Sequence, residues 1–316
     1  MDVVPIPFPV TSAAALALKR TPDQVARMTR PEREDRVQRL VGYAHWMVDR
    51  AIAQHFDKRS VAAIAVLYSG GNDSTTLAHI FRQRATCAVH ANTTIGVEAT
   101  REFVRETCAG WGLPLLEKRP QASYRDLVLE RGFPGPGQHF KMYQRLKERC
   151  LEQARSELVG NPFKERVLFL GGRRRSESRR RAGLAASDRK GSMVFTSPLV
   201  LWTKLDMNTY RLMCGDVPVN EVSELIHMSG ECLCGSFATK GELEEVGFWF
   251  PQVREEIEAL EEELADRTDI PEIRRKWGWG AYRADLAALK ARGHFKSGAM
   301  CTSCDSRATG GEVIAV

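Results

Sequence analysis

The order of apolar and polar positions predicts an alternation of helices and strands. Over residues 32–56, apolar side chains recur every three to four positions, as expected of an amphipathic helix that packs on a sheet. Residues 61–68 form a short continuous apolar run with β-branched members, which favours a buried parallel strand. A second helix is expected from Ser74 onward, so that a strand, a loop and a helix follow one another.

The same alternation continues further along the chain. It predicts a strand at 86–91, a helix at 97–111, a helix around 140–158 and a strand at 167–170. Strands that alternate with helices usually pair in parallel. The sequence therefore predicts an α/β fold with an open, mostly parallel sheet, helices on both faces, and ligands at the carboxyl ends of the strands.

The two ends of the chain read differently. Residues 1–31 combine prolines with an alanine-rich stretch and predict an irregular arm. After Asp206 the pattern changes to short helices and irregular links, followed by an acidic helical segment at 252–266. We expect three parts: an N-terminal arm and helix (1–56), a nucleotide-binding α/β domain (57–230), and a small α-rich, cysteine-containing C-terminal region (231–316).

Composition restricts the classes of protein. Hydrophobic residues at 43% and charged residues at 27% are close to globular averages and argue against a disordered or fibrous chain. No apolar run reaches the ~20 residues that span a bilayer, and no basic-then-apolar leader is visible, so we expect a cytoplasmic protein without membrane contact. The net charge of +6 does not identify a nucleic-acid binder. Six arginines within 173–181 indicate either a solvated loop or a phosphate site.

A glycine pair lies between the predicted strand and helix. Gly70 and Gly71 allow positive φ and close approach of a ligand, while the helix that follows presents free N–H groups and the positive end of its dipole. Ser69 and Ser74 add hydroxyls. The Asp73 carboxylate would repel phosphate unless Mg²⁺ lay between them. These residues predict an anion site, with a purely structural turn as the alternative.

The hexapeptide at 69–74 resembles the PP-loop signature Ser-Gly-Gly-x-Asp-Ser of the adenine-nucleotide α-hydrolases. It lacks the Gly-Lys-Ser/Thr ending of Walker loops and the spaced glycines of dinucleotide-binding folds. The resemblance implies that the loop holds the pyrophosphate part of ATP, which is cleaved between its α- and β-phosphates. The implied nucleotide contacts are Ser69, Gly70, Gly71, Asn72, Asp73 and Ser74.

Three further blocks resemble the phosphoadenosine phosphosulfate reductase family, over roughly residues 60–235. Residues 172–181 resemble Gly-Ile-Arg-x-x-Glu-Ser-x-x-Arg, with Arg173 in place of the isoleucine. Residues 198–210 resemble Pro-Leu-x-x-Trp-x-x-x-Asp-x-x-x-Tyr. Asn92 and Thr93 lie where relatives carry an Asp-Thr-Gly turn beside the adenine, so that Asn92 departs from the pattern.

The resemblance implies roles for single residues. Arg174 and Arg181 would face nucleotide or substrate phosphates, to which guanidinium groups can bind through two hydrogen bonds. The other arginines of 173–181 remain either surface charge or a nucleic-acid contact. The implied catalytic residues are Asp73, Arg174, Glu177 and Arg181, and the implied further nucleotide contacts are Asn92, Thr93, Gly172 and Arg174.

Two close cysteine pairs predict a metal site. Cys232 and Cys234 form one pair, and Cys301 and Cys304 the other. Such spacing suits soft-metal ligation, and zinc, a 4Fe-4S cluster or unrelated buried thiols are all compatible with it. The cluster is favoured by the resemblance to adenylyl-sulfate reductases and DNA sulfur-modification enzymes, although Leu233 separates two cysteines that are adjacent in the reductases. Cys87, Cys108, Cys150 and Cys214 are expected to be buried thiols, and His79 and His139 to be packing or surface residues rather than catalysts.

Two related chemistries compete. Reductases carry a nucleophilic cysteine in a C-terminal tail and tend to lack the loop aspartate. This chain retains Asp73, and it has no spare cysteine in the tail if all four paired cysteines bind a metal. We therefore expect an ATP pyrophosphatase that adenylates an acceptor for sulfur transfer, using ATP, Mg²⁺ and a 4Fe-4S cluster (or zinc), with cysteine desulfurase or thioredoxin as sulfur donor. The alternatives are an adenylyl-sulfate or phosphoadenylyl-sulfate reductase that releases sulfite, and a non-catalytic module that binds nucleic acid through 173–181.

Overall fold

The computed structural model describes residues 3–8, 12–177 and 181–282. Its centre is a six-stranded sheet with the order β3-β2-β1-β4-β6-β5. All neighbouring strands are parallel except β5 and β6, which form an antiparallel pair at one edge. The predicted open, mostly parallel α/β sheet is confirmed. The strands are β1 (Ser60–Leu67), β2 (Cys87–Ala91), β3 (Leu115–Lys118), β4 (Glu165–Leu170), β5 (Ser187–Lys190) and β6 (Met193–Thr196).

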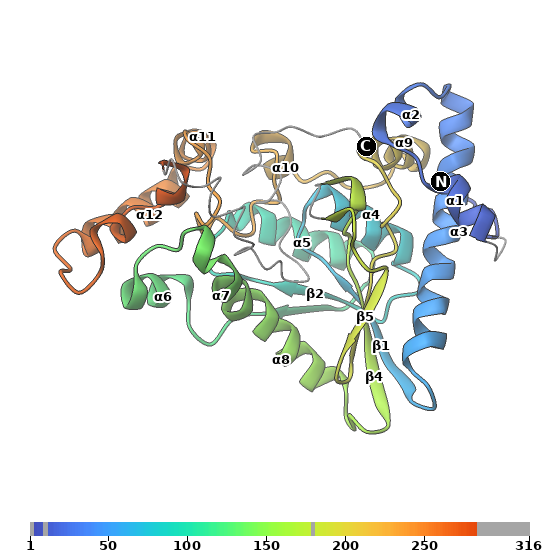
Figure 1. The fold of residues 1–316 in the computed structure, drawn as a ribbon, viewed down its shortest axis with the longest axis horizontal. Coiled ribbons are helices and arrows are strands. Elements are labelled where there is room, and N and C mark those ends of the chain that lie inside the picture. Colours follow the sequence, from blue (N-terminus) through green and yellow to red (C-terminus); the bar gives the residue numbers. More distant parts are fainter. Residues whose placement is uncertain (1–2, 9–11, 178–180, 283–316) are drawn as a thin grey trace.

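Helices cover both faces of this sheet (Figure 1). Helices α4 (Asn72–Phe81) and α5 (Glu98–Gly110) lie on one side, whereas α8 (Arg149–Leu158) lies on the other. Successive side chains of each strand point to opposite faces of the sheet, so a separate apolar core forms on each face. Val66 and Leu168 face α3 (Arg30–His55), α4 and α5, while Val89 and Phe169 face α8. The near-continuous apolar character of β1 follows from this burial on both faces.

The expectation of an irregular arm over residues 1–31 is wrong in part, because two helices form there: α1 (Ser12–Leu18) and α2 (Pro22–Ala26). Capping explains the start of α2 and of α3. Thr29 accepts a hydrogen bond from the main chain of Glu32, whose carboxylate accepts one from the Thr29 N–H, and Thr21 and Gln24 do the same for α2. After each cap, a proline occupies one of the first two helical positions: Pro22 in α2 and Pro31 in α3.

The helix predicted around 140–158 is not a single α-helix. It consists of α7 (His139–Tyr143), a π-helical turn (Gln144–Glu148) and α8. A π-turn pairs each residue with the fifth one along instead of the fourth, which rotates the later turns relative to the earlier ones. The 3.6-residue periodicity predicts which side of this segment is buried, but not the extra residue that the π-helical turn adds to the helix.

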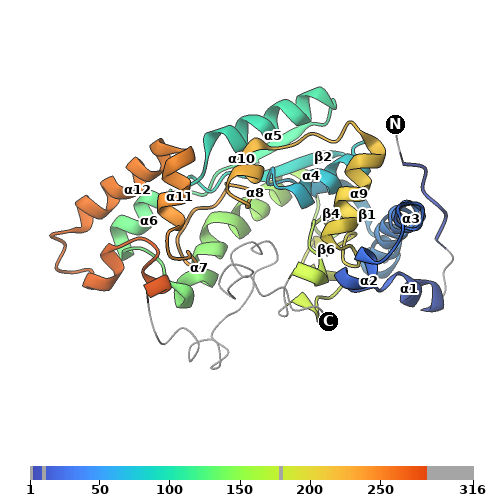
Figure 2. The ribbon, with the colours of Figure 1, turned by 90° about the horizontal axis from the view of Figure 1, so that it is seen from above.

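Three helices, α6 (Tyr124–Arg131), α11 (Glu242–Trp249) and α12 (Pro251–Leu264), gather at the end of the molecule away from α3 (Figure 1). In both views α11 and α12 lie beside α6 (Figures 1 and 2). Residues from 95–146 and from 222–279 share one apolar core. The domain boundaries expected at 56/57 and 230/231 stay a prediction. Two helices, α9 (Lys204–Cys214) and α10 (Glu221–Leu225), precede this region, and short 3-10 turns span Pro136–Gln138, Arg175–Glu177, Glu272–Arg275 and Trp279–Tyr282.

None of the helices in the described part of the chain combines the length and the apolar composition that a bilayer span requires.

Candidate active site

The glycine loop connects β1 to α4 at the carboxyl edge of the sheet. Gly70 has a φ of +74°, and a Cβ on it would lie 2.9 Å from Thr100 Cγ2. Its carbonyl accepts a hydrogen bond from Asn220 Nδ2 at 3.0 Å. Because both the positive φ and the close packing exclude a side chain, the loop conformation depends on glycine here.

The start of α4 has no side-chain cap. Gly71 occupies the N-cap position and caps no N–H group. The hydroxyls of Ser74 and Thr75 instead donate to the Gly71 carbonyl, at 2.9 and 3.0 Å, and the Ser69 N–H donates to Ser74 Oγ at 3.3 Å. These internal bonds fix the loop while the first N–H groups of the helix stay available to an anion.

The four residues predicted to be catalytic form one connected chain of contacts. Arg174 Nε donates to Asp73 Oδ2 at 2.7 Å, and the Arg174 main-chain N–H donates to Glu177 Oε2 at 2.9 Å. The same Glu177 carboxylate is paired with Arg181. Gly172 lies directly against Asp73. A Cβ on this glycine would be only 3.2 Å from the Asp73 carbonyl, so the absence of a side chain lets the two loops approach closely. The loop after β4 thus lies directly against the loop after β1.

Electrostatics in this cluster are dominated by burial. Burial and the nearby Asp73 charge raise the pKa of Glu177, despite the opposing charges of Arg181 and Arg174. Burial disfavours the charged form of Arg174, but Asp73 and Glu177 outweigh it and raise the pKa of this guanidinium. Arg174 therefore remains a cation at the point where phosphate charge would arrive.

Asn92 and Thr93 follow β2 at the same edge, but their polar side-chain atoms are engaged internally. Asn92 Nδ2 donates to Glu117 Oε1 at 2.7 Å, and Asn92 Oδ1 accepts from the Thr94 N–H at 3.0 Å. The Thr93 hydroxyl bonds to Glu231. A nucleotide contact by these two residues, which stays a prediction, would thus use the main chain or require rearrangement.

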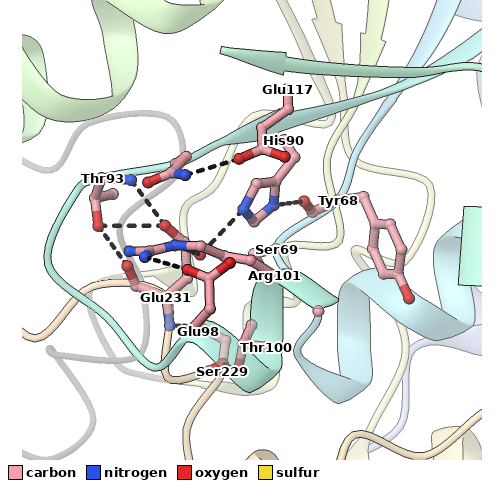
Figure 3. A network of polar contacts seen from close by, with 12 residues as sticks. Tyr68, Ser69, His90, Thr93, Glu98, Thr100, Arg101, Glu117, Ser229 and Glu231 are labelled. Atoms are coloured by element: carbon pink, nitrogen blue, oxygen red, sulfur yellow. Dashed lines mark hydrogen bonds and ion pairs between the residues drawn. The ribbon is translucent and has the colours of Figure 1, made fainter. Parts of the chain in front are cut away.

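Behind this turn lies a buried polar network that the sequence did not indicate (Figure 3). Glu231 accepts a hydrogen bond from the Thr93 N–H at 2.7 Å and lies 3.0 Å from His90 Nε2 and 3.6 Å from Arg101 Nε. The other ring nitrogen of His90 is 2.8 Å from the Tyr68 carbonyl, immediately before the glycine loop. Neither a motif nor a spacing connects Glu231 with residues some 140 positions earlier, so no sequence signal could have identified this network.

Glu231 belongs to a segment, residues 229–234, that packs along the turn after β2. The Val97 N–H donates to the Gly230 carbonyl at 2.8 Å, and the Leu233 N–H donates to the Ile95 carbonyl at 3.0 Å. A Cβ on Gly96 would lie 2.6 Å from the Gly230 and Glu231 carbonyl oxygens, so this close approach requires glycine. The segment places the first cysteine pair beside the candidate nucleotide site.

Within that pair, Cys234 is buried and Cys232 is half-buried. Cys301 and Cys304 lie outside the described residues, so the four-thiolate site stays a prediction. Among residues 3–8, 12–177 and 181–282, no group of three or more histidine, cysteine, aspartate or glutamate side chains is arranged to hold a metal ion. The predicted burial of Cys87, Cys108, Cys150 and Cys214 is confirmed, and His79 and His139 are buried in packing positions rather than on the surface.

The arginines of 173–181 have different surroundings. Arg175 donates twice to the Leu184 carbonyl, at 3.1 and 2.8 Å, and so holds the following loop. Arg173 contacts Ser197 Oγ at 3.1 Å. Arg179 and Arg180 lie outside the described residues.

The Glu117 carboxylate ties Asn92 to α5 and makes stability dependent on pH. Hydrogen bonding from Arg105 has the largest effect on Glu117 and lowers its pKa. Burial opposes this, and a hydrogen bond from Asn92 lowers the pKa further, so that it comes to about 2. A lowered carboxyl pKa stabilises the fold above the unfolded pKa, and this contribution is lost as the pH falls toward about 2. We expect Glu117→Gln to lower the free energy of unfolding by about 1 kcal/mol at pH 7, since the pair is partly solvated, and by much less at pH 3.

Urea titrations of both proteins at the two pH values measure this difference. An equal loss at pH 7 and pH 3 would show that the carboxylate charge does not contribute.

Several solved structures are similar to this chain. Phosphoadenylyl-sulfate reductase from Candida auris, in a phosphate complex, is 15% identical over 70% of this chain and 94% of that chain, with a TM-score of 0.40. FMN adenylyltransferase from Candida glabrata, in complex with ATP, is 14% identical over 66% and 65%, with a TM-score of 0.44. NH3-dependent NAD synthetase from Campylobacter jejuni is 15% identical over 83% and 98%, with a TM-score of 0.40.

No curated protein sequence matches the chain. A family model described as the phosphoadenosine phosphosulfate reductase domain matches residues 63–225, which is more than half of the chain. The matched range includes the glycine loop, the Asn92 turn and the Arg174–Glu177–Arg181 cluster. It confirms the resemblance read from the motifs, and the chain belongs to the phosphoadenosine phosphosulfate reductase domain family.

Proposed function

We propose that this protein is an ATP pyrophosphatase that adenylates an acceptor for sulfur transfer. The observation that carries the proposal is the placement of the Asp73 carboxylate at the uncapped start of α4, 2.7 Å from Arg174. Arg174 balances the charge of this carboxylate in the structure. Beside bound phosphates the carboxylate is still unfavourable unless a divalent cation is shared with the ligand. Retention of Asp73 is therefore more consistent with Mg²⁺-bound pyrophosphate than with a reductase that splits none.

The residues around the loop have separate tasks in this reaction. The N–H groups at 71–74 and the Ser69 hydroxyl bind the β- and γ-phosphates, and the Ser74 hydroxyl joins them by giving up its hydrogen bond to the Gly71 carbonyl. Asp73 would hold Mg²⁺, since carboxylate and hydroxyl oxygens suit a hard cation, and the ion would supply charge neutralisation of the departing pyrophosphate. Arg174 and Arg181 stabilise charge at the α-phosphate. Glu177 holds both arginines in place.

The covalent step exchanges one bond for another. An acceptor oxygen bonds to the α-phosphorus and gives any proton it carries to solvent, the bond from that phosphorus to the bridging oxygen breaks, and pyrophosphate leaves with the electron pair of that bond. Sulfur from the donor then bonds to the acceptor atom that carries the adenylylated oxygen, the bond between that atom and the oxygen breaks, and AMP leaves with the oxygen. A sulfur donor protein, such as a cysteine desulfurase or thioredoxin, is required as a partner.

The cysteine pairs belong to the sulfur-handling half of the proposal. Cys232 and Cys234 lie on the segment that packs against the turn after β2, and thiolates suit iron or zinc. With Cys301 and Cys304 they would hold a 4Fe-4S cluster, or zinc in its place. Anaerobic purification distinguishes the two: broad absorbance near ~400 nm with bound iron supports the cluster, and a colourless protein with stoichiometric zinc overturns it.

Product analysis tests the reaction itself. The purified protein is incubated with ATP and Mg²⁺, and separately with adenylyl sulfate or phosphoadenylyl sulfate and reduced thioredoxin. Pyrophosphate from ATP, accompanied by AMP because water takes the place of the acceptor in this incubation, supports the proposal. Sulfite release without pyrophosphate identifies the reductase instead, and binding of nucleic acid with neither product identifies a non-catalytic module.

A further inference from the structure

Arg173 and Arg174 are neighbours in sequence but face opposite sides of the end of β4. Strand β4 lies between β1 and β6 in the sheet. Arg174 Nε contacts Asp73, in the loop after β1, at 2.7 Å, whereas Arg173 Nε contacts Ser197, after β6, at 3.1 Å. The two guanidinium groups therefore contact the ends of two different strands at the carboxyl edge of the sheet.

Main-chain hydrogen bonds before and after Arg173 in the sequence fix its position. The Gly171 N–H donates to the Thr196 carbonyl at 2.9 Å, and the Arg175 N–H donates to the Val200 carbonyl at 3.1 Å. Arg173 Nε also lies back over Gly171, 3.7 Å from where a Cβ on that glycine would be. Its hydrogen-bond acceptor, Ser197, is fully buried. The guanidinium is thus oriented by the fold before any ligand arrives.

No carboxylate in the described ranges is paired with the Arg173 guanidinium. Arg174 is paired with Asp73 and Arg181 with Glu177, whereas Arg173 makes no ion pair within the described ranges. Its Nη1 and Nη2 atoms have no hydrogen-bond partner among those residues, and its one contact is a neutral hydroxyl. Burial, helped by the nearby charge of Arg181, lowers the pKa of Arg173, and the charges of Asp188 and Glu177 offset this only in part.

We propose that Arg173, oriented by Ser197, forms a second oxyanion subsite that binds a phosphate, sulfate or carboxylate group of the acceptor, on the β6 side of the nucleotide. The two Nη atoms, which have no hydrogen-bond partner among residues 3–8, 12–177 and 181–282, form the fork that binds an oxyanion through two parallel hydrogen bonds. The nucleotide phosphates are assigned to the β1 side, where the glycine loop and Arg174 lie. This inference rests on the proposed function, because it takes the β1 side to be occupied by ATP.

Calorimetry with the loop already filled tests the subsite. The full-length protein is saturated with α,β-methylene ATP and Mg²⁺, and inorganic sulfate is titrated in. The wild type binds one sulfate, and Arg173→Met weakens the affinity at least 10-fold. Arg173→Lys weakens it about 3-fold, because the charge remains while the fork is lost. The matched control, Arg189→Met at an exposed position of β5, binds sulfate as the wild type does.

Two results would overturn the subsite: no sulfate binding by the filled wild type, or equal binding by the wild type and both Arg173 variants. Affinity for the nucleotide analogue and pyrophosphate release are measured on every protein. If no protein releases pyrophosphate, the proposed function fails; if release is intact but Arg173→Met leaves sulfate affinity unchanged, only this inference fails.

The source of the oxyanion is distinguished by a second titration, with a ten-residue oligothymidylate in place of sulfate. A polynucleotide acceptor predicts that Arg173→Met weakens oligothymidylate binding and reduces the slope of log affinity against log salt by about 1. A small anionic acceptor predicts that the variant loses sulfate affinity while oligothymidylate binding is weak and unchanged.

Discussion

Replacing Asp73 with asparagine lowers the rate of pyrophosphate release from ATP by about 100-fold or more. Asparagine has the same shape and can still accept the hydrogen bond from Arg174 Nε, so the fold should persist. It loses the charge that would hold Mg²⁺ against the phosphates, and removing one electrostatic contact of this kind costs roughly 10²–10³ in rate. Initial rates at saturating ATP and Mg²⁺ measure the effect.

Asp35→Asn provides the matched control for this variant. Asp35 lies on α3, where it pairs with Arg39 on an exposed surface. Such pairs contribute little to stability, so this variant should release pyrophosphate at the wild-type rate and unfold at nearly the same urea concentration. Wild-type turnover by a well-folded Asp73→Asn protein would remove Asp73 from the site.

The largest effect on stability is expected from Glu231→Ala, which should lower the free energy of unfolding by about 3–5 kcal/mol. Glu231 is almost fully buried, and it accepts the hydrogen bond from the Thr93 N–H beside His90 and Arg101. Removing it leaves a buried donor unpaired and two basic groups without their common carboxylate. Urea unfolding followed by circular dichroism gives the difference in free energy.

A graded series separates the hydrogen bond from the charge. Glu231→Gln keeps an oxygen that can accept from Thr93 but loses the charge beside His90 and Arg101, so its loss of stability should lie between those of the wild type and Glu231→Ala. Glu221→Ala, at the exposed start of α10, should change stability by less than about 0.5 kcal/mol. A Glu231→Ala loss as small as this control would mean that the network contributes nothing net.

The strands and helices that carry the glycine loop could be predicted because their signals are local. A buried strand with both faces covered is a continuous apolar run, and Gly70 and Gly71 mark the turn that follows it. The edge strand β5 was missed, since Ser187–Lys190 is largely exposed and contains two basic residues and an aspartate, which hide the pattern of a strand. β3 is too short, at four residues, to show a period.

For the candidate site, the motifs predicted residues that do meet, including Asp73, Arg174 and Glu177. What those residues do stays a prediction. The same holds for the nucleotide contacts expected of Asn92 and Thr93, whose side chains bond to Glu117 and Glu231 in the structure. Partners that lie far apart in sequence are chosen by tertiary packing, and a single sequence carries no record of such pairs.

The strand order also has a consequence for how the protein is made. Strand β1 pairs with β4, and Asp73 meets Arg174, 101 residues later in the chain. A growing chain can pair β1 with β2 early, but it cannot assemble the site until β4 and the loop after it have been synthesised. At a typical 5–20 residues per second, the half-finished sheet waits several seconds with the β4-facing edge of β1 unpaired. That interval, in which an apolar strand edge is open to other chains, is when aggregation is the greatest hazard during expression.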